Sequence, residues 1–350
     1  MSVYQIKYMD AVPDSAVCNE AVKLAKRHKF AQLSGFVNGV IRNIARNIDS
    51  VQFDTLSIQY SMPQWIVDRF VAAYGEKKAE EIFKAFHSKS TISIRTNLTR
   101  CTPDELRVML EAEGVTVTAV DELNYAFVIS GFDYLNGLQS FRDGLFYVQD
   151  ISSMLVAQTA APKKGDYVID VCAAPGGKST HIAELLQGSG HVLARDLTDN
   201  KVDMIEENIE RHGLNNMSAE VWDATVFDAD SAGKADILIC DLPCSGLGVL
   251  GRKKDIRYKM TPESVDELTA LQRQILDTVH TYVKPNGVLV YSTCTIDEAE
   301  NEDNVRWFIE KHPEFELDKS FAEGTGMKQI LPGEHGSDGF FIARFIKSKL

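Results

Sequence analysis

The stretch VIDVCAAPGGKS, residues 168–179, joins an apolar run to a turn of small residues and the start of a helix. Two further apolar runs, ADILIC at residues 235–240 and GVLVY at residues 287–291, have the length and composition of buried strands. Between residues 199 and 212, Val202, Ile205 and Ile209 form one helical stripe that ends at Gly213, a typical C-cap. Helices are also expected at residues 262–282 and 297–311. This alternation predicts a doubly wound α/β sheet.

The turn after the first strand has the small residues of a nucleotide-binding turn but lacks a phosphate-binding glycine pattern. A P-loop requires glycine where this chain has Cys172. A dinucleotide fingerprint requires spaced glycines, whereas Gly176 and Gly177 are adjacent. Both observations argue against a pyrophosphate ligand.

Two acidic residues follow later strands. Asp196 ends the run LARD, where a carboxylate can accept hydrogen bonds from a ribose diol. Asp223, in VWDA, can meet the exocyclic amine of an adenine. A ribose and an adenine without a phosphate site indicate S-adenosylmethionine. The alternatives are a helix cap for Asp196, in competition with Thr198 or Asp199, and turn chemistry for Asp223.

Two cysteines stand just beyond predicted strands, Cys244 in DLPC and Cys294 in STC. Chemistry in an open α/β sheet gathers where strands end, so the two thiols are expected to share one site. Cys18, Cys101 and Cys240 are expected to be small apolar residues of the core. The six cysteines contain no C-x-x-C pair, which favours reduced thiols in a cytosol over a disulfide framework or a zinc cage.

These motifs, in this order, resemble those of the Sun/Fmu (RsmB-type) family of RNA cytosine-5 methyltransferases. The match includes residues 170–178, Asp196, Asp223, residues 241–246 and residues 292–295, and ends in DGFFIAR at residues 338–344. The resemblance implies a Rossmann-like methyltransferase sheet that binds S-adenosylmethionine. It also implies that Cys294 attacks the base, that Cys244 helps release the product, and that Asp241 faces the N3 and N4 edge of the cytosine. The implied cofactor-binding residues are Cys172, Ala173, Ala174, Pro175, Gly176, Gly177, Lys178, Asp196, Asp223 and Asp241.

The chain is expected to contain three domains. Residues 1–52 resemble the second half of a helical NusB-like domain, so a truncated remnant with exposed apolar helix faces is expected. Residues 53–140 show a helix to about His87 and then strand, helix, strand and strand, as in the small α+β RNA-binding domain of the family. The alternative for this segment is a plain packing domain. Residues 141–350 would form the catalytic domain.

The charge distribution bears on the partner. The net charge of −13 is unfavourable for binding RNA. However, residues 1–47 contain seven Lys and Arg against three acids, and Arg252, Lys253, Lys254, Arg257 and Lys259 cluster after the DLPC motif. RNA is therefore the expected partner, and a monomer is favoured. The sequence has no signal peptide and no apolar run of membrane-spanning length, so a cytoplasmic location without membrane association is expected.

The predicted function is methyl transfer from S-adenosylmethionine to C5 of a cytosine in RNA, most readily 16S rRNA of the small subunit. Two alternatives remain open at this point. One is the same chemistry on tRNA or another rRNA site, and the other is a noncatalytic RNA-binding or transcription-associated module.

Overall fold

The computed structural model describes residues 1–88 and 91–349, and the chain forms two compact units, residues 1–61 and 62–350. Within the described residues no helix is both long enough and apolar enough to span a bilayer.

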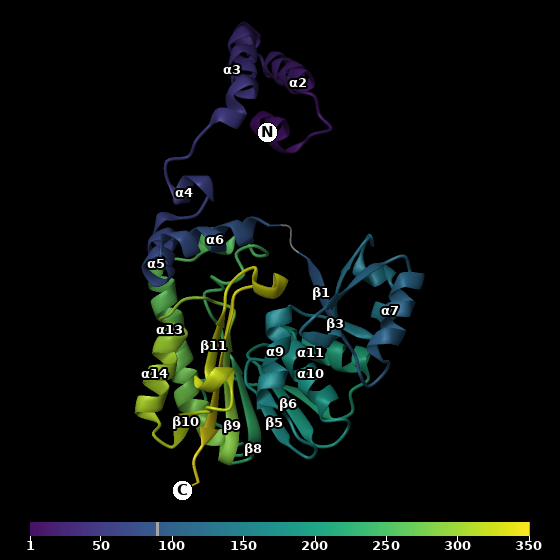
Figure 1. Cartoon of the computed structure of the whole chain (residues 1–350), viewed down its shortest axis with the longest axis vertical. Coiled ribbons are helices and arrows are strands. Elements are labelled where there is room, and N and C mark those ends of the chain that lie inside the picture. Colours follow the sequence, from purple (N-terminus) through teal and green to yellow (C-terminus); the bar gives the residue numbers. More distant parts are fainter. Residues whose placement is uncertain (89–90, 350) are drawn as a thin grey trace. The chain divides into compact units, whose positions relative to one another are not determined.

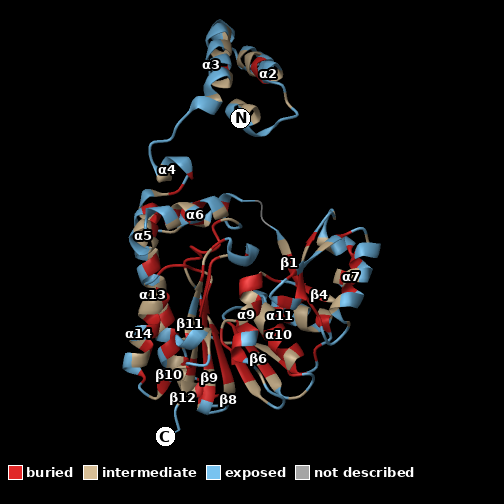
Figure 2. Ribbon diagram, viewed as in Figure 1, coloured by how far each residue is buried: buried red, intermediate tan, exposed pale blue. Residues whose placement is uncertain are grey.

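The first unit is helical and has a small core. Val17 and Cys18 pack with Ile41 across two helices. Large apolar side chains such as Phe30 and Phe36 stay exposed, as the sequence predicts, and Figure 2 shows few buried residues here. The elements are α1 (Ser2–Tyr8), α2 (Asp14–Arg27), α3 (Ser34–Asn47) and α4 (Leu56–Gln59).

The second unit opens with two helices and a small antiparallel sheet. The single helix predicted up to His87 is divided at Gly75, which has a φ of 78° and separates α5 (Gln64–Tyr74) from α6 (Glu76–His87). The sheet has the strand order β2-β3-β1-β4, and α7 packs on it. Its last strand lies beyond the domain boundary predicted at residue 140. The elements are β1 (Ile92–Thr96), α7 (Pro103–Ala112), β2 (Thr116–Val120), β3 (Leu123–Ser130), α8 (Gln139–Arg142) and β4 (Phe146–Val148).

The large sheet carries the predicted motifs. Its strand order is β10-β12-β9-β8-β5-β6-β7, and β11 pairs with β12. Strands β5 to β9 are parallel, whereas β12 is antiparallel to β9. The strands are β5 (Tyr167–Asp170), β6 (His191–Asp196), β7 (Met217–Val221), β8 (Ala235–Asp241), β9 (Val283–Thr293), β10 (Phe315–Leu317), β11 (Met327–Ile330) and β12 (Phe340–Lys347).

Helices cover both faces of this sheet (Figure 1). Because strand side chains alternate, Leu238 and Cys240 face α13 and α14, while Ile237 and Ile239 face α9, α10 and α11. Figure 2 shows the central strands as mostly buried. The helices are α9 (Ile151–Ala160), α10 (Gly177–Leu185), α11 (Asp199–His212), α12 (Ile256–Lys259), α13 (Pro262–Val279) and α14 (Glu302–Lys311).

Most predicted elements of this region are present, with local differences. The helix expected at 262–282 ends at Val279 and continues as one 3₁₀ turn, His280–Tyr282. The helix expected from residue 297 begins at Glu302, because Asp297 accepts a hydrogen bond from the Ala299 amide in a separate turn. Strand β9 begins before the run predicted at residues 287–291 and includes Asn286, which has a φ of 61°.

Candidate active site

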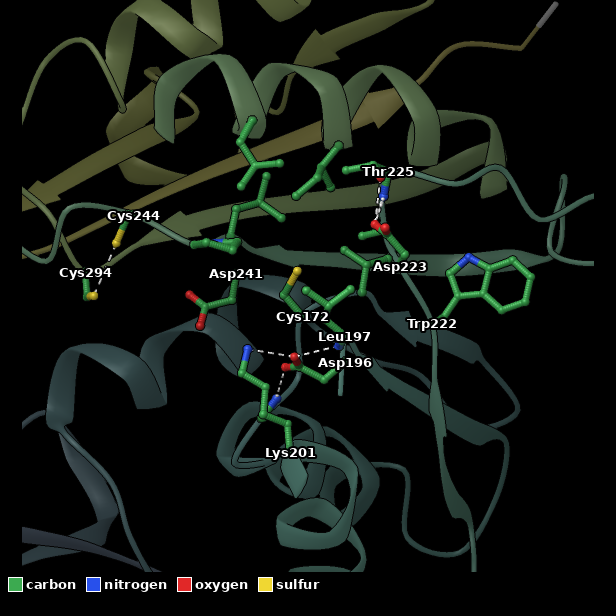
Figure 3. Close-up of a pocket in the computed structure, with 17 residues that line it drawn as sticks. Cys172, Asp196, Leu197, Lys201, Trp222, Asp223, Thr225, Asp241, Cys244 and Cys294 are labelled. Atoms are coloured by element: carbon green, nitrogen blue, oxygen red, sulfur yellow. Dashed lines mark hydrogen bonds and ion pairs between the residues drawn. The ribbon is translucent and has the colours of Figure 1, made fainter. Parts of the chain in front are cut away.

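The pocket that contains most of the predicted site residues lies at the carboxyl ends of β5, β6, β8 and β9 (Figure 3). The chain runs from β5 outward to β6 and β7 and then returns to β8 on the other side of β5. Ligands bind at such a reversal of strand order in open α/β sheets. The cavity measures about 270 Å³ and includes the predicted residues Cys172, Ala174, Asp196, Asp223, Asp241, Cys244 and Cys294.

A buried carboxylate holds the turn at residues 172–178. Asp170, the last residue of β5, accepts hydrogen bonds from the Ser179 hydroxyl at 2.5 Å and from the Cys172 amide at 3.4 Å. Gly176 has a φ of 101°, so it supplies the left-handed step before α10 begins. Burial raises the pKa of Asp170 to about 7. This role of Asp170 was not predicted, because its partner Ser179 lies across the turn.

Asp196 forms the floor of the pocket. Its carboxylate accepts hydrogen bonds from the amides of Ala174 at 2.9 Å and Leu197 at 2.8 Å, and from Lys201 Nζ at 2.8 Å (Figure 3). The N-cap position of α11 belongs to Thr198 instead. Three of about four acceptor positions are therefore used within the protein, and one remains for a ligand. Lys201 also lines the pocket and was not among the predicted site residues.

Asp223 lies at the exposed rim of the pocket. Its carboxylate accepts hydrogen bonds from the Thr225 amide at 2.9 Å and the Thr225 hydroxyl at 2.7 Å. These bonds lower the pKa of Asp223. The alternative interpretation, turn chemistry, thus describes its contacts within the protein, although the residue still lines the cavity beside Trp222 and Leu197.

The two predicted thiols meet at one end of the pocket, with Cys244 Sγ 3.3 Å from Cys294 Sγ (Figure 3). The adjacent parallel strands β8 and β9 bring them together, because Asp241 is paired with Ser292 in the register of the sheet. The hydrogen bond from Cys244 lowers the pKa of Cys294, and Lys178 and Lys253 act in the same direction. The same bond and burial raise the pKa of Cys244.

Lys178 and Asp241 form an ion pair of 2.6 Å beside the thiols. Burial alone would lower the pKa of Lys178, but Asp241 raises it above its ordinary value, so the ammonium stays charged. Asp241 also accepts a hydrogen bond of 2.7 Å from the Ser292 hydroxyl, which orients its carboxylate.

A buried polar group supports the loop that carries Cys244. Glu300 accepts hydrogen bonds from the Ser245 amide and from Gln272 Nε2, both at 2.9 Å. Gln272 also donates to the Pro243 carbonyl at 2.8 Å. These residues come from distant parts of the chain, so no local pattern in the sequence could indicate them.

The remaining predicted turn residues shape the turn and do not line the pocket. Ala173 is buried, and its amide donates to the Arg195 carbonyl at 2.8 Å. The Pro175 carbonyl accepts a hydrogen bond of 2.9 Å from Asn208. A Cβ atom on Gly177 would lie 3.1 Å from the Tyr147 ring. The lining of this cavity does not include Ala173, Pro175, Gly176, Gly177 or Lys178.

The lining suits a nucleoside that carries a positive charge. Leu197, Ala224 and Ile275 provide apolar surface for a base, and Asp196 has an acceptor position for a ribose hydroxyl. The carboxylates of Asp196, Asp223 and Asp241 make the cavity favourable for a sulfonium and unfavourable for a pyrophosphate.

Comparisons with known proteins agree with this site. Residues 157–346 match the family described as 16S rRNA methyltransferase RsmB/F, residues 1–46 match the NusB family, and residues 62–132 match the ferredoxin-like domain of RsmF/B-like methyltransferases. These matches confirm the predicted fold class, a Rossmann-like methyltransferase preceded by an α+β domain and a NusB-like segment.

The similarity to individual relatives covers most of the chain. The probable ribosomal RNA small subunit methyltransferase B of Bacillus subtilis is 37% identical, over 99% of this chain and 81% of its own length. The crystal structure of PH0851 has a TM-score of 0.82 and 28% identity, over 99% of this chain and 80% of that one. NSun6 from Pyrococcus horikoshii with SFG has a TM-score of 0.75 and 25% identity, over 82% and 99%.

SFG is an analogue of S-adenosylmethionine, and the family match is to methyltransferases, so the predicted cofactor S-adenosylmethionine is confirmed. The 37% identity to the Bacillus subtilis relative and the family match over residues 157–346 show to which family the chain belongs. The chain belongs to the RsmB/F family of 16S rRNA methyltransferases.

Proposed function

We propose that this chain methylates C5 of a cytosine in small-subunit rRNA through a covalent adduct between a cysteine and C6 of the base. The observation that carries the proposal is the pair of thiols, Cys244 and Cys294, 3.3 Å apart at one end of the cofactor pocket. A methyltransferase acting on a nucleophilic nitrogen or oxygen would need no such pair.

The chemistry explains why a thiol is required. C5 of cytosine is a poor nucleophile because its electrons belong to an aromatic ring. A thiolate that adds to C6 breaks the aromaticity and makes C5 enamine-like. When bound, S-adenosylmethionine supplies the electrophilic methyl group. Cys294 suits the attacking role, because the hydrogen bond from Cys244 and the nearby ammonium groups stabilise its thiolate.

The second thiol suits the release step. After methyl transfer, C5 must lose its proton and the Cys294–C6 bond must break. The hydrogen bond to Cys294 and burial raise the pKa of Cys244, so this thiol is protonated before attack. Once Cys294 is bound to carbon, Cys244 loses its proton to solvent and, as a thiolate, accepts the proton from C5; the Cys294–C6 bond then breaks and Cys294 leaves as a thiolate.

We infer that Asp241 and Lys178 meet the edge of the base where charge develops. A thiolate adding to C6 places negative charge on the N3 side of the ring. The ion pair of 2.6 Å between Lys178 and Asp241 offers both an acceptor for the N4 amine and a positive charge for that edge. We infer that Asp241 accepts from N4 while Lys178 offsets the charge that forms.

The family match and the two N-terminal matches support rRNA over tRNA as the substrate. The relative in Bacillus subtilis is itself named a small-subunit methyltransferase. Reading C5-methylated cytosines in 16S rRNA and tRNA from a deletion strain tests the choice: one lost 16S rRNA site supports the proposal, and a lost tRNA site supports the alternative. Comparing naked rRNA with assembled subunits as substrates then defines the assembly stage.

A denaturing gel of each cysteine variant with substrate RNA and cofactor tests the mechanism. Cys244→Ala should accumulate a heat-stable protein–RNA band, because attack and methylation proceed but release fails. Cys294→Ala should give no band and no methylation. Cys101→Ala, which removes a thiol of the small sheet, serves as the matched control and should behave like the unaltered protein.

Two outcomes would contradict the assignment. A band from Cys294→Ala and none from Cys244→Ala would exchange the two roles. Full methylation by both variants without any adduct would exclude the covalent mechanism and leave a noncatalytic role for the thiols.

A further inference from the structure

A cluster of side chains that could ligate a metal lies near the amino-terminal end of β9, at the opposite end of this strand from the thiols. It consists of Asp277 on α13, His280 in the following 3₁₀ turn and His312 at the end of α14. His280 stands three residues before the start of β9, whereas Cys294 follows its end. Figure 1 shows α13 and α14 side by side on this face. One potential ligand atom from each residue lies within 4.8 Å of the others.

The ring of His280 is oriented as in a metal ligand. Its Nδ1–H donates to the Asp277 carbonyl at 2.8 Å, so in the neutral ring the lone pair is on Nε2. Nε2 lies 3.7 Å from Oε1 of Glu314. Histidines that bind metals usually donate their other ring N–H to a carbonyl or carboxylate in this way. Here two electron-rich atoms face each other with room for a cation.

His312 presents an unsatisfied nitrogen to the same space. The residue is 6% exposed, and its Nε2 is buried without a hydrogen-bond partner in the described part of the chain. This nitrogen lies 3.3 Å from Oδ1 of Asp277, and the His280 and His312 rings are 3.9 Å apart. Lys311 holds the other oxygen of Asp277 at 2.9 Å, which leaves Oδ1 directed at the histidines.

The unpartnered nitrogen of His312 points to a missing ligand. A buried polar atom without a partner costs free energy unless a ligand satisfies it.

We propose that Asp277, His280 and His312 bind one Zn²⁺ ion in a tetrahedral site whose fourth ligand is water. Two imidazoles and a carboxylate are ordinary zinc ligands, and the Glu314 carboxylate beside His280 helps balance the charge of the ion. Bonds of about 2.0–2.1 Å place ligands about 3.3 Å apart in a tetrahedron, so the side chains must move closer together on binding. The ion would join the ends of α13 and α14.

Zinc titration of the full chain, after treatment with a chelator, tests the site. The titration uses a Cys244→Ser/Cys294→Ser background, so that the thiols of the active site cannot take the ion. We expect one equivalent of Zn²⁺ to bind and to raise the melting temperature, while Mg²⁺ does neither. Co²⁺ in the same site should show the strong visible absorption of a tetrahedral complex.

Asp277→Asn and His280→Gln each remove one ligand from a partly exposed position, so the fold should survive. Each should weaken zinc binding more than about 100-fold, the upper end of what loss of an outer-shell partner costs. His335→Gln, which removes a half-exposed histidine of another loop, is the matched control and should leave binding unchanged. The proposal would be overturned if the Cys244→Ser/Cys294→Ser background bound no zinc. It would also be overturned if Asp277→Asn and His280→Gln bound zinc as tightly as that background does.

Discussion

The carboxylate of Asp196 should determine how tightly the chain binds S-adenosylmethionine. The side chain is buried at the pocket floor and accepts three hydrogen bonds from Ala174, Leu197 and Lys201. Its remaining acceptor position faces the cavity that we assign to the ribose. Asp196→Ala removes one charge-assisted hydrogen bond to the ligand, which is typically worth about 1.5–3 kcal/mol. The dissociation constant should therefore rise roughly 10-fold to 150-fold.

Asp196→Asn keeps one acceptor oxygen but, like Asp196→Ala, disturbs the turn. The amide keeps one acceptor oxygen, but its NH₂ group must face either the Ala174 amide or the Leu197 amide, both of which are donors. The turn should therefore loosen in both variants, and the ligand-free protein should melt at a lower temperature. A buried amide left without a partner costs about 1–3 kcal/mol.

Calorimetric titration with S-adenosylmethionine measures the affinity, and thermal melting without ligand measures the cost to the fold. Asp199→Asn is the matched control, because this exposed acid lies in the first turn of the same helix but outside the pocket lining. Unchanged affinity in Asp196→Ala would remove this residue from the cofactor site. A tenfold loss in Asp199→Asn would mean that general charge, not the specific contact, governs binding.

Three further results are expected. Cys244→Ala removes the hydrogen bond that lowers the pKa of Cys294, so alkylation of Cys294 at pH 7 should slow; an unchanged rate would show that the bond does not stabilise the thiolate. Glu184→Gln leaves the buried guanidinium of Arg95 without its charge partner and should cost about 3 kcal/mol, measured by urea unfolding; a loss below about 1 kcal/mol would contradict this. Asp170 has a pKa of about 7 in the folded protein against about 3.9 in the unfolded chain, so the native state retains a proton that the unfolded state releases. Stability should therefore fall as the pH rises from 4 to 7, and Asp170→Asn should remove that part of the pH dependence of the urea midpoint.

Local patterns predict the central elements well, because those elements satisfy their own hydrogen bonds and bury one face. The helix expected at residues 199–212 has those bounds in the structure, and Gly213 adopts the left-handed conformation of a C-cap with a φ of 67°. The antiparallel strands β10, β11 and β12 were not predicted as a group. Their pairing joins residues 315–317 and 327–330 to residues 340–347, and such register depends on contacts that no short window of sequence contains.

The part of the site that could be predicted lies at the ends of parallel strands. Parallel neighbours end at the same edge, so residues just after β8 and β9 had to lie near each other, and Cys244 and Cys294 do. Lys201 and Glu300 could not be found in this way. Lys201 reaches Asp196 from within a helix, and Glu300 reaches the Ser245 amide across 55 residues of sequence.

The different roles of the two thiols also depend on surroundings that the sequence does not display. Both cysteines follow a strand, and both are half-buried. The hydrogen bond between the two thiols raises the pKa of Cys244 and lowers that of Cys294. Glu300 raises the pKa of Cys244 further, whereas Lys178 and Lys253 lower that of Cys294 against the opposing charge of Asp241. The shared hydrogen bond and the surrounding charges thus separate two chemically identical groups, which is how neighbouring acids and bases acquire distinct roles. The thiolate should form on Cys294 and the proton should stay on Cys244, the order that attack followed by release requires.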